Sequence, residues 1–158
     1  MKIIFLDIDG VLNTYGEDGS LASWEHCKSE LMHNLEKIVK ETDAYIVISS
    51  SWREEGIELL KESGFQYVDR IIGVTPHWIQ GFYIEHRGEQ IMGYVRQNGI
   101  HQYIVIDDEP FDICGERCNV ISKDKVVITN HTEGLTEEKA NEAIRKLNAQ
   151  ADRNRAKI

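Results

Sequence analysis

The segment Ile3–Gly10 (IIFLDIDG) is an apolar run that ends in two acids one residue apart and a glycine. Its β-branched, apolar first half predicts a strand buried on both faces, as in parallel sheets. Alternate residues of an extended segment point the same way, so Asp7 and Asp9 would converge on one spot. Carboxylates so close repel each other unless a cation or a shared proton intervenes, and Mg²⁺ prefers such oxygen ligands. Taken alone, the segment also fits a strand that runs into an ordinary Asp/Gly turn.

The composition is typical of a single globular domain. The chain has 158 residues, of which 41% are hydrophobic and 28% are charged, enough to bury a core. We expect one domain over residues 1–150 and a polar C-terminal tail over residues 151–158 that frays. The three cysteines are an odd set, which favours a reducing, cytoplasmic location. No signal peptide and no membrane-spanning stretch are expected.

The charge restricts the partners of the protein. A formal net charge of −9 at pH 7 opposes broad, sequence-independent binding to nucleic acid or to an anionic membrane. It leaves room for a local basic pocket. The sequence makes no prediction of the oligomeric state.

Strand-like and helix-like segments alternate along the chain. Strands are predicted at residues 3–6, 44–48, 68–74, 103–106 and 126–128, and helices at residues 24–40, 54–62, 88–97 and 136–150. Residues 75–86 are expected to form only a loop. This alternation predicts an α/β fold: a three-layer, Rossmann-like sandwich with a mainly parallel central sheet.

Polar side chains follow three of the predicted strands. Asp7 and Asp9 follow the first strand, Ser49–Arg53 (SSSWR) the second, and Asp107–Glu109 (DDE) the strand at 103–106, while Arg87 opens a helix. Ligands bind outside the carboxyl ends of parallel strands, so these groups are expected to meet. Together they suit phosphoryl transfer. A carboxylate attacks phosphorus, a metal offsets charge, hydroxyls hold the phosphoryl oxygens and a cation stabilises the transferring group.

From Lys2 to Leu147 this ordered set resembles the motifs of the haloacid dehalogenase (HAD) superfamily of phosphotransferases. By that resemblance Asp7 is the nucleophile that becomes an aspartyl phosphate. Asp9 is the general acid and then the general base, and its backbone carbonyl binds the metal. The pair Asp107 and Asp108 would complete a Mg²⁺ site with Asp7 and Asp9.

The same resemblance gives four phosphate-binding candidates. Ser50 is favoured as the motif hydroxyl because Arg53 lies three residues after it, as in several relatives, and Ser49 is the alternative. Arg53 either binds phosphate or is a surface charge in the first turn of its helix. Arg87 stands where the superfamily usually has lysine, and arginine keeps the charge and adds bidentate phosphate contact.

Finer features resemble one small group of capless HAD domains, which includes the phosphatase-like domains of multi-part RNA repair proteins. The stretches concerned are DGVLN (9–13), SSSWR (49–53), RGEQI (87–91), IDDE (106–109) and GLT (134–136). The segments 13–23 and 75–86 are too short for a substantial cap domain. An open site follows, which would admit a bulky substrate such as a nucleic-acid end, whereas small-metabolite phosphatases generally need a lid.

The resemblance implies a Mg²⁺-dependent phosphomonoester hydrolase with a phosphorylated substrate, nucleic-acid 3′-phosphate ends being one candidate. Hydrolysis of nucleotides or other small phosphoesters is the alternative, as is a non-catalytic binding or regulatory module. Trp52, Trp78 and Tyr83 are interpreted either as base-stacking or as packing residues. His131 is interpreted as structural.

Overall fold

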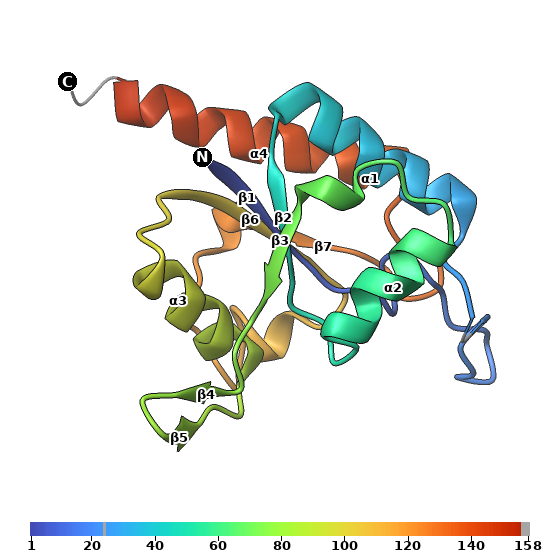
Figure 1. Cartoon of the computed structure of the whole chain (residues 1–158), viewed down its shortest axis with the longest axis horizontal. Coiled ribbons are helices and arrows are strands. Elements are labelled where there is room, and N and C mark those ends of the chain that lie inside the picture. Colours follow the sequence, from blue (N-terminus) through green and yellow to red (C-terminus); the bar gives the residue numbers. More distant parts are fainter. Residues whose placement is uncertain (24, 156–158) are drawn as a thin grey trace.

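The computed structural model describes the backbone of residues 1–23 and 25–155. Its centre is a five-stranded sheet in the order β3-β2-β1-β6-β7, in which every neighbouring pair is parallel. The strands are β1 (Lys2–Leu6), β2 (Tyr45–Ile48), β3 (Ile71–Val74), β6 (Gln102–Asp107) and β7 (Val126–Ile128) (Figure 1). The predicted α/β class and parallel sheet are confirmed.

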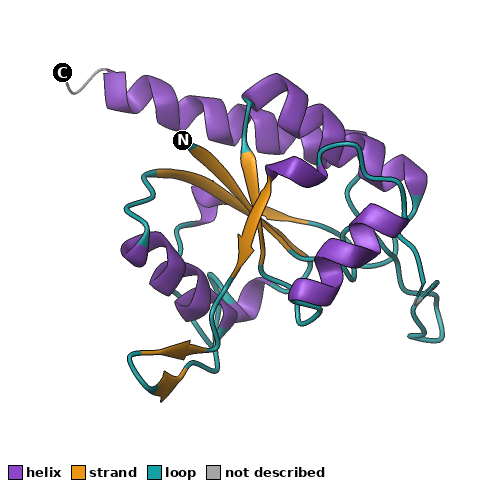
Figure 2. Cartoon of the chain, in the orientation of Figure 1, coloured by secondary structure: helices purple, strands orange, loops and turns teal. Residues whose placement is uncertain are grey.

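Helices cover both faces of the sheet (Figure 2). Buried residues of α1 (Ser29–Thr42), α2 (Glu54–Glu62) and α4 (Glu137–Arg155) pack on the face that holds Ile4 and Leu6. Helix α3 (Arg87–Gln97) packs on the other face with Ile3 and Phe5. All four of these β1 side chains are 0% exposed. Fully burying one such side chain contributes about 1.5–3 kcal/mol, so β1 anchors both layers.

Two helix boundaries differ from the prediction. Helix α1 begins at Ser29 and not at residue 24 as predicted. Residues 25–28 are not helical, and residue 24 lies outside the described part of the chain. It ends at Asp43, which has a φ of 56° in the left-handed region. Helix α4 continues to Arg155, beyond the expected end at Gln150. The amide of Gln150 bonds to both backbone groups of Tyr103 in β6, so the helix is attached to the sheet at the point where it was expected to stop.

The segments around β3 also differ from the prediction. Only Ile71–Val74 of the expected strand is extended, because Val68–Arg70 forms a 3₁₀ turn. In that turn Arg70 pairs with Asp43 at 2.6 Å instead of joining the sheet.

Residues 75–86 are not a plain loop. They contain a two-stranded hairpin, β4 (Trp78–Ile79) and β5 (Phe82–Tyr83), which projects from the body of the molecule (Figure 1). Its turn residues Gln80 and Gly81 have φ values of 51° and 84°, as two-residue hairpin turns require. The hairpin is far too small to be a cap domain, so the expectation of a fold without a substantial cap is confirmed. No helix in the described part of the chain is long and apolar enough to cross a membrane.

Candidate metal and phosphoryl-transfer site

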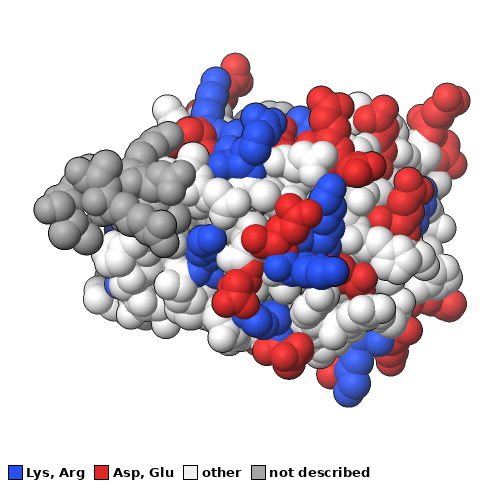
Figure 3. All heavy atoms as spheres, turned by 90° about the horizontal axis from the view of Figure 1, so that it is seen from above, with Lys and Arg blue, Asp and Glu red and all other residues white. Residues whose placement is uncertain are grey.

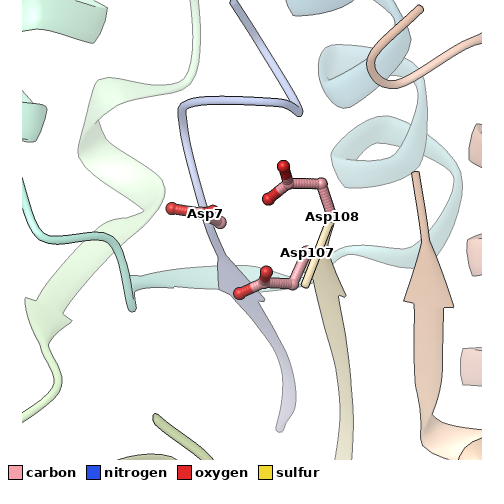
Figure 4. A group of neighbouring side chains, drawn as sticks. All are labelled: Asp7, Asp107 and Asp108. Atoms are coloured by element: carbon pink, nitrogen blue, oxygen red, sulfur yellow. The ribbon is translucent and has the colours of Figure 1, made fainter. Parts of the chain in front are cut away.

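Three carboxylates converge at the carboxyl edge of the sheet (Figure 4). Asp7 directly follows β1, Asp107 ends the neighbouring β6, and Asp108 is the next residue. One carboxylate oxygen from each lies within 4.8 Å of those of the other two. Asp7 and Asp107 are 6% and 1% exposed. An all-oxygen set of buried acids is the donor chemistry that a hard divalent cation such as Mg²⁺ prefers, so these residues can hold a metal.

Gly10 makes room for this group. Its φ is 79°, and a Cβ atom built on it would lie only 2.3 Å from Oδ2 of Asp108. The carbonyl of Gly10 accepts a hydrogen bond from Thr129 Oγ1 at 2.7 Å, which fixes the turn against the end of β7. The glycine is therefore required both by the backbone conformation and by the close approach of the Asp108 carboxylate.

Arg87 brings the positive charge to these acids. Its Nη1 lies 3.0 Å from Asp7 Oδ2 and 2.7 Å from Asp107 Oδ2. Its backbone N–H, at the first position of α3, donates to Asp112 Oδ2 at 2.9 Å. Burial alone would lower the pKa of Arg87, but Asp7 and Asp107 together raise it above its ordinary value. The predicted position of Arg87 beside the acids is therefore what the structure has.

The carboxylates remain in excess over this single cation. Burial, and then the charge of Asp7, raise the pKa of Asp107 to about 8 and that of Asp108 to about 7. Arg87 acts in the opposite direction on Asp107 but does not cancel the desolvation. A second positive charge would let all three acids ionise together, which again fits a divalent cation.

Asp9 is held apart from the carboxylate group. Its Oδ2 accepts a hydrogen bond of 2.9 Å from the indole Nε1 of Trp52, and within the described residues its buried Oδ1 has no partner. Burial raises the pKa of Asp9, and the Trp52 bond opposes that rise. The side chain of Asp9 is not part of the metal-ligand set of Asp7, Asp107 and Asp108. A carboxyl group with a raised pKa keeps its proton to a higher pH than an ordinary carboxyl group does.

The three serines after β2 have different surroundings. The backbone N–H of Ser49 donates to Leu6 O at 2.9 Å, beside Asp7, and its buried Oγ has no partner among the described residues. The Oγ of Ser50 accepts a bond from Trp52 N at 3.3 Å. Ser51 is exposed and lines the cleft described below. Ser49 is thus the serine whose hydroxyl is buried next to the acids and still uncommitted.

Arg53 occupies a turn and not the cleft. Its guanidinium donates to the backbone carbonyl of Thr75, and its buried Nε has no partner in the described part of the chain. Its φ of 52° is rarely adopted by a residue with a side chain. Burial lowers the pKa of Arg53. The side chain is therefore not an ordinary solvated charge, although it does not line the same cavity as Arg87.

The acids open into a cleft of about 480 Å³. Its walls are formed by Asp7, Asp9, Tyr15, Gly19, Ser51, Arg87, Asp108, Glu109, Phe111 and His131. The sequence pattern predicted the acids and Arg87 but did not single out Tyr15, Ser51 or Phe111, and His131 was interpreted as structural. A signal existed for two of the rings: Phe111 and His131 lie three to four residues after strands β6 and β7, which end at this edge.

Comparisons with known proteins found a likeness to a protein family and to solved structures. The sequence model of the family described as "HAD domain in Swiss Army Knife RNA repair proteins" matches residues 3–140. A Legionella pneumophila structure, proposed to be a HAD superfamily (subfamily III A) hydrolase, aligns with a TM-score of 0.47 and 13% identity, covering 100% of this chain and 91% of that chain. No curated protein matches the sequence. The family match spans every acid of the site as well as Arg87.

Proposed function

This chain belongs to the family of HAD domains in Swiss Army Knife RNA repair proteins, and we propose that it is a Mg²⁺-dependent phosphomonoester hydrolase. One observation carries the proposal: Asp7 lies beside Arg87 and among acids that could hold a metal, while Asp9, two residues later, is outside that set and is hydrogen-bonded to Trp52. Two neighbouring carboxyl groups with such different surroundings suit two different roles, a nucleophile and a proton carrier.

In the first step a carboxylate oxygen of Asp7 attacks phosphorus and the ester P–O bond breaks. Asp9 gives its proton to the departing oxygen, which leaves as an alcohol. In the second step Asp9, now a carboxylate, takes a proton from the water that attacks the aspartyl phosphate. Inorganic phosphate leaves and Asp7 is regenerated. The pKa of Asp9 is raised, mainly by burial, which is the direction that a proton donor requires.

The remaining groups would bind the phosphoryl oxygens. Arg87 already lies within 3.0 Å of Asp7 Oδ2, so its other guanidinium N–H groups are close enough to stabilise a phosphoryl group on that residue. The uncommitted hydroxyl of Ser49 is a second donor, with Ser50 as the alternative. Mg²⁺ held by Asp7, Asp107 and Asp108 would offset the charge shared by the phosphate and its attacker.

For the substrate we propose a phosphate at a nucleic-acid end, with nucleotides and other small phosphoesters as the second candidate. The family name and the open cleft support an end substrate. On the part of the α1 and α4 face whose side chains the structure describes, acidic and basic side chains are interspersed (Figure 3). A net charge of −9 favours contact with a strand end over contact with its length. The complete set of acids speaks against a non-catalytic module.

The test is Mg²⁺-dependent release of phosphate from an aryl phosphate, nucleoside monophosphates and an oligonucleotide with a 3′-phosphate. Asp7→Asn should lower kcat by at least about 10⁴-fold, as loss of a nucleophile does elsewhere. The matched control is Asp69→Asn, an exposed acid in the 3₁₀ turn before β3, which should retain full activity. Full activity of Asp7→Asn would refute the mechanism. Release mainly from small phosphates would favour the second substrate class.

A further inference from the structure

Three aromatic rings stand at the outer part of the cleft, and the proposed reaction does not use them. Tyr15 follows β1, Phe111 follows β6 and His131 follows β7, and all three line the same cavity as Asp7 and Asp9. Phe111 is 46% exposed. Large apolar side chains that are exposed beside reacting groups commonly mark a ligand site.

Tyr15 and His131 are held together by their backbones. The N–H of Tyr15 donates to the carbonyl of His131 at 2.9 Å, and the ring centroids are 6.0 Å apart in an edge-to-face arrangement. The His131 loop is closed by a bond of 2.7 Å from Gly134 N to Asn130 O. The two rings therefore form one fixed wall.

Phe111 is fixed independently. Its carbonyl accepts bonds from the N–H groups of Arg117 at 2.9 Å and Cys118 at 3.0 Å. Gly115 packs so closely that an added Cβ atom would lie 2.6 Å from the Cα of Phe111. A ring on such a backbone loses little conformational entropy when a ligand stacks on it.

The charges around the rings restrict what can stack there. Asp9, Asp108 and Glu109 line the cleft, and Arg87 is the only lysine or arginine among the residues that form its walls in the described chain. Burial and then Asp9 raise the pKa of Tyr15, so its hydroxyl is neutral at physiological pH. The cavity thus offers aromatic faces and, at Glu109, an acceptor for N–H groups that the proposed reaction does not use. The excess of acids in its walls disfavours a second phosphate inside it, although the Arg117 guanidinium lies 5.9 Å from the centroid of the Phe111 ring.

We propose that Tyr15, Phe111 and His131 form a subsite for the base of a single leaving nucleoside. The inference rests on the proposed phosphatase function and defines the leaving group of that reaction. A nucleobase presents flat faces to the rings and N–H groups to the acids. In a longer strand the next phosphodiester would have to lie outside the cleft. The cleft would therefore contact only the terminal nucleotide.

The first test is equilibrium binding, which does not depend on turnover. Adenosine 3′-monophosphate and glycerol 2-phosphate, an ester without a base, are titrated by calorimetry into the Asp7→Asn protein with Mg²⁺. The nucleotide should bind about ten- to hundredfold more tightly, the range that stacking of one base gives. Equal affinities, or no binding of the nucleotide at millimolar concentration, would overturn the proposal.

Substitutions of single rings test whether the rings cause the tighter binding of the nucleotide. Phe111→Leu and Tyr15→Leu, each made on the Asp7→Asn background and checked by thermal melting, should each reduce the affinity ratio at least severalfold. Phe82→Leu is the control, because this ring is 73% exposed but belongs to the hairpin and not to the cleft. A ratio that survives in both ring variants would contradict the assignment.

Turnover by the wild-type protein separates this proposal from the function on which it rests. An oligonucleotide with a 3′-phosphate should have a kcat/KM within a few-fold of the mononucleotide. A preference of tenfold or more for the oligonucleotide would overturn recognition of a single nucleoside. Base-dependent binding without phosphate release from any ester would refute the hydrolase and leave the subsite standing.

Discussion

At the inner end of the cleft the sheet itself holds Asp7 and Asp107, whereas at the outer rim loops hold Tyr15, Phe111 and His131. The inner acids are almost fully buried, and their positions follow from the parallel register of β1 and β6. The rim residues depend on backbone hydrogen bonds between segments far apart in the sequence. In the reaction that we propose, the sheet would thus position the reacting groups and the rim segments would select the leaving group.

Among substitutions that change no charged group, Gly10→Ala should cause the largest effect, because it displaces the Asp108 carboxylate at the inner end of the cleft. The new Cβ atom would meet the Asp108 carboxylate at 2.3 Å, and displacement of a ligand or its support typically costs about 10- to 100-fold in metal affinity or activity. The measurement is the Mg²⁺ dependence of phosphate release.

Gly64→Ala is the matched control for that variant. Gly64 has a φ of 88°, so it carries similar backbone strain, but an added Cβ would meet nothing within 4 Å. It should lose some stability and keep its Mg²⁺ dependence. Equal effects of the two substitutions on Mg²⁺ affinity would show that strain, and not the approach of Asp108, matters at Gly10.

Trp52→Phe should have the next largest effect, since Trp52 holds the Asp9 carboxyl group in the wall of the cleft. Without the indole N–H the Asp9 carboxyl group loses the hydrogen bond of 2.9 Å that Trp52 donates, and we expect kcat to fall up to about tenfold, part of what general acid–base catalysis contributes. The loss should grow as the leaving group becomes more basic, because such a group needs the proton more. A series of aryl phosphates measures this.

Trp78→Phe is the control for Trp52→Phe. Trp78 is 63% exposed on the hairpin, so its replacement should leave the dependence on the leaving group unchanged. If Trp52→Phe lowered activity equally for all leaving groups, the role of Trp52 would be packing and not the orientation of Asp9.

The smallest expected effect is the pH dependence of folding stability that arises from the acids at the inner end of the cleft. In the metal-free protein the pKa values of Asp107 and Asp108 are raised to about 8 and about 7, above the ordinary value of 3.8 that applies after unfolding. Their contribution to stability is therefore present below about pH 4 and is lost as the pH rises through 7 and 8.

Thermal melting between pH 5 and 8.5 tests this sign. The melting temperature in a chelator should fall as the pH rises, and Mg²⁺ should restore it most at the upper end, by about 2–4 °C per kcal/mol of binding energy. Asp108→Asn should weaken both trends. A melting temperature that rises with pH in chelator would contradict the excess of buried negative charge.

The sequence predicted the inner end well and the rim poorly, for physical reasons. A strand buried on both faces must be apolar, so Ile3–Leu6 and the acids that follow it are visible as a pattern. Arg87 was found because it opens a helix between two such strands. Tyr15 lies in a loop and Phe111 in the short 3₁₀ turn Pro110–Asp112, where no periodicity separates a ring that packs from one that faces a ligand. The hairpin at residues 78–83 was missed because its strands have only two residues each.

The identity of the nucleophile is the central claim, and chemical trapping of the acyl phosphate tests it most directly. The protein is mixed with substrate and Mg²⁺, quenched during turnover and treated with borohydride, which reduces an aspartyl phosphate to homoserine. Peptide mass spectrometry should then find homoserine at position 7, only when substrate and Mg²⁺ are both present. Steady turnover with an unmodified Asp7, or homoserine at another aspartate, would contradict the account.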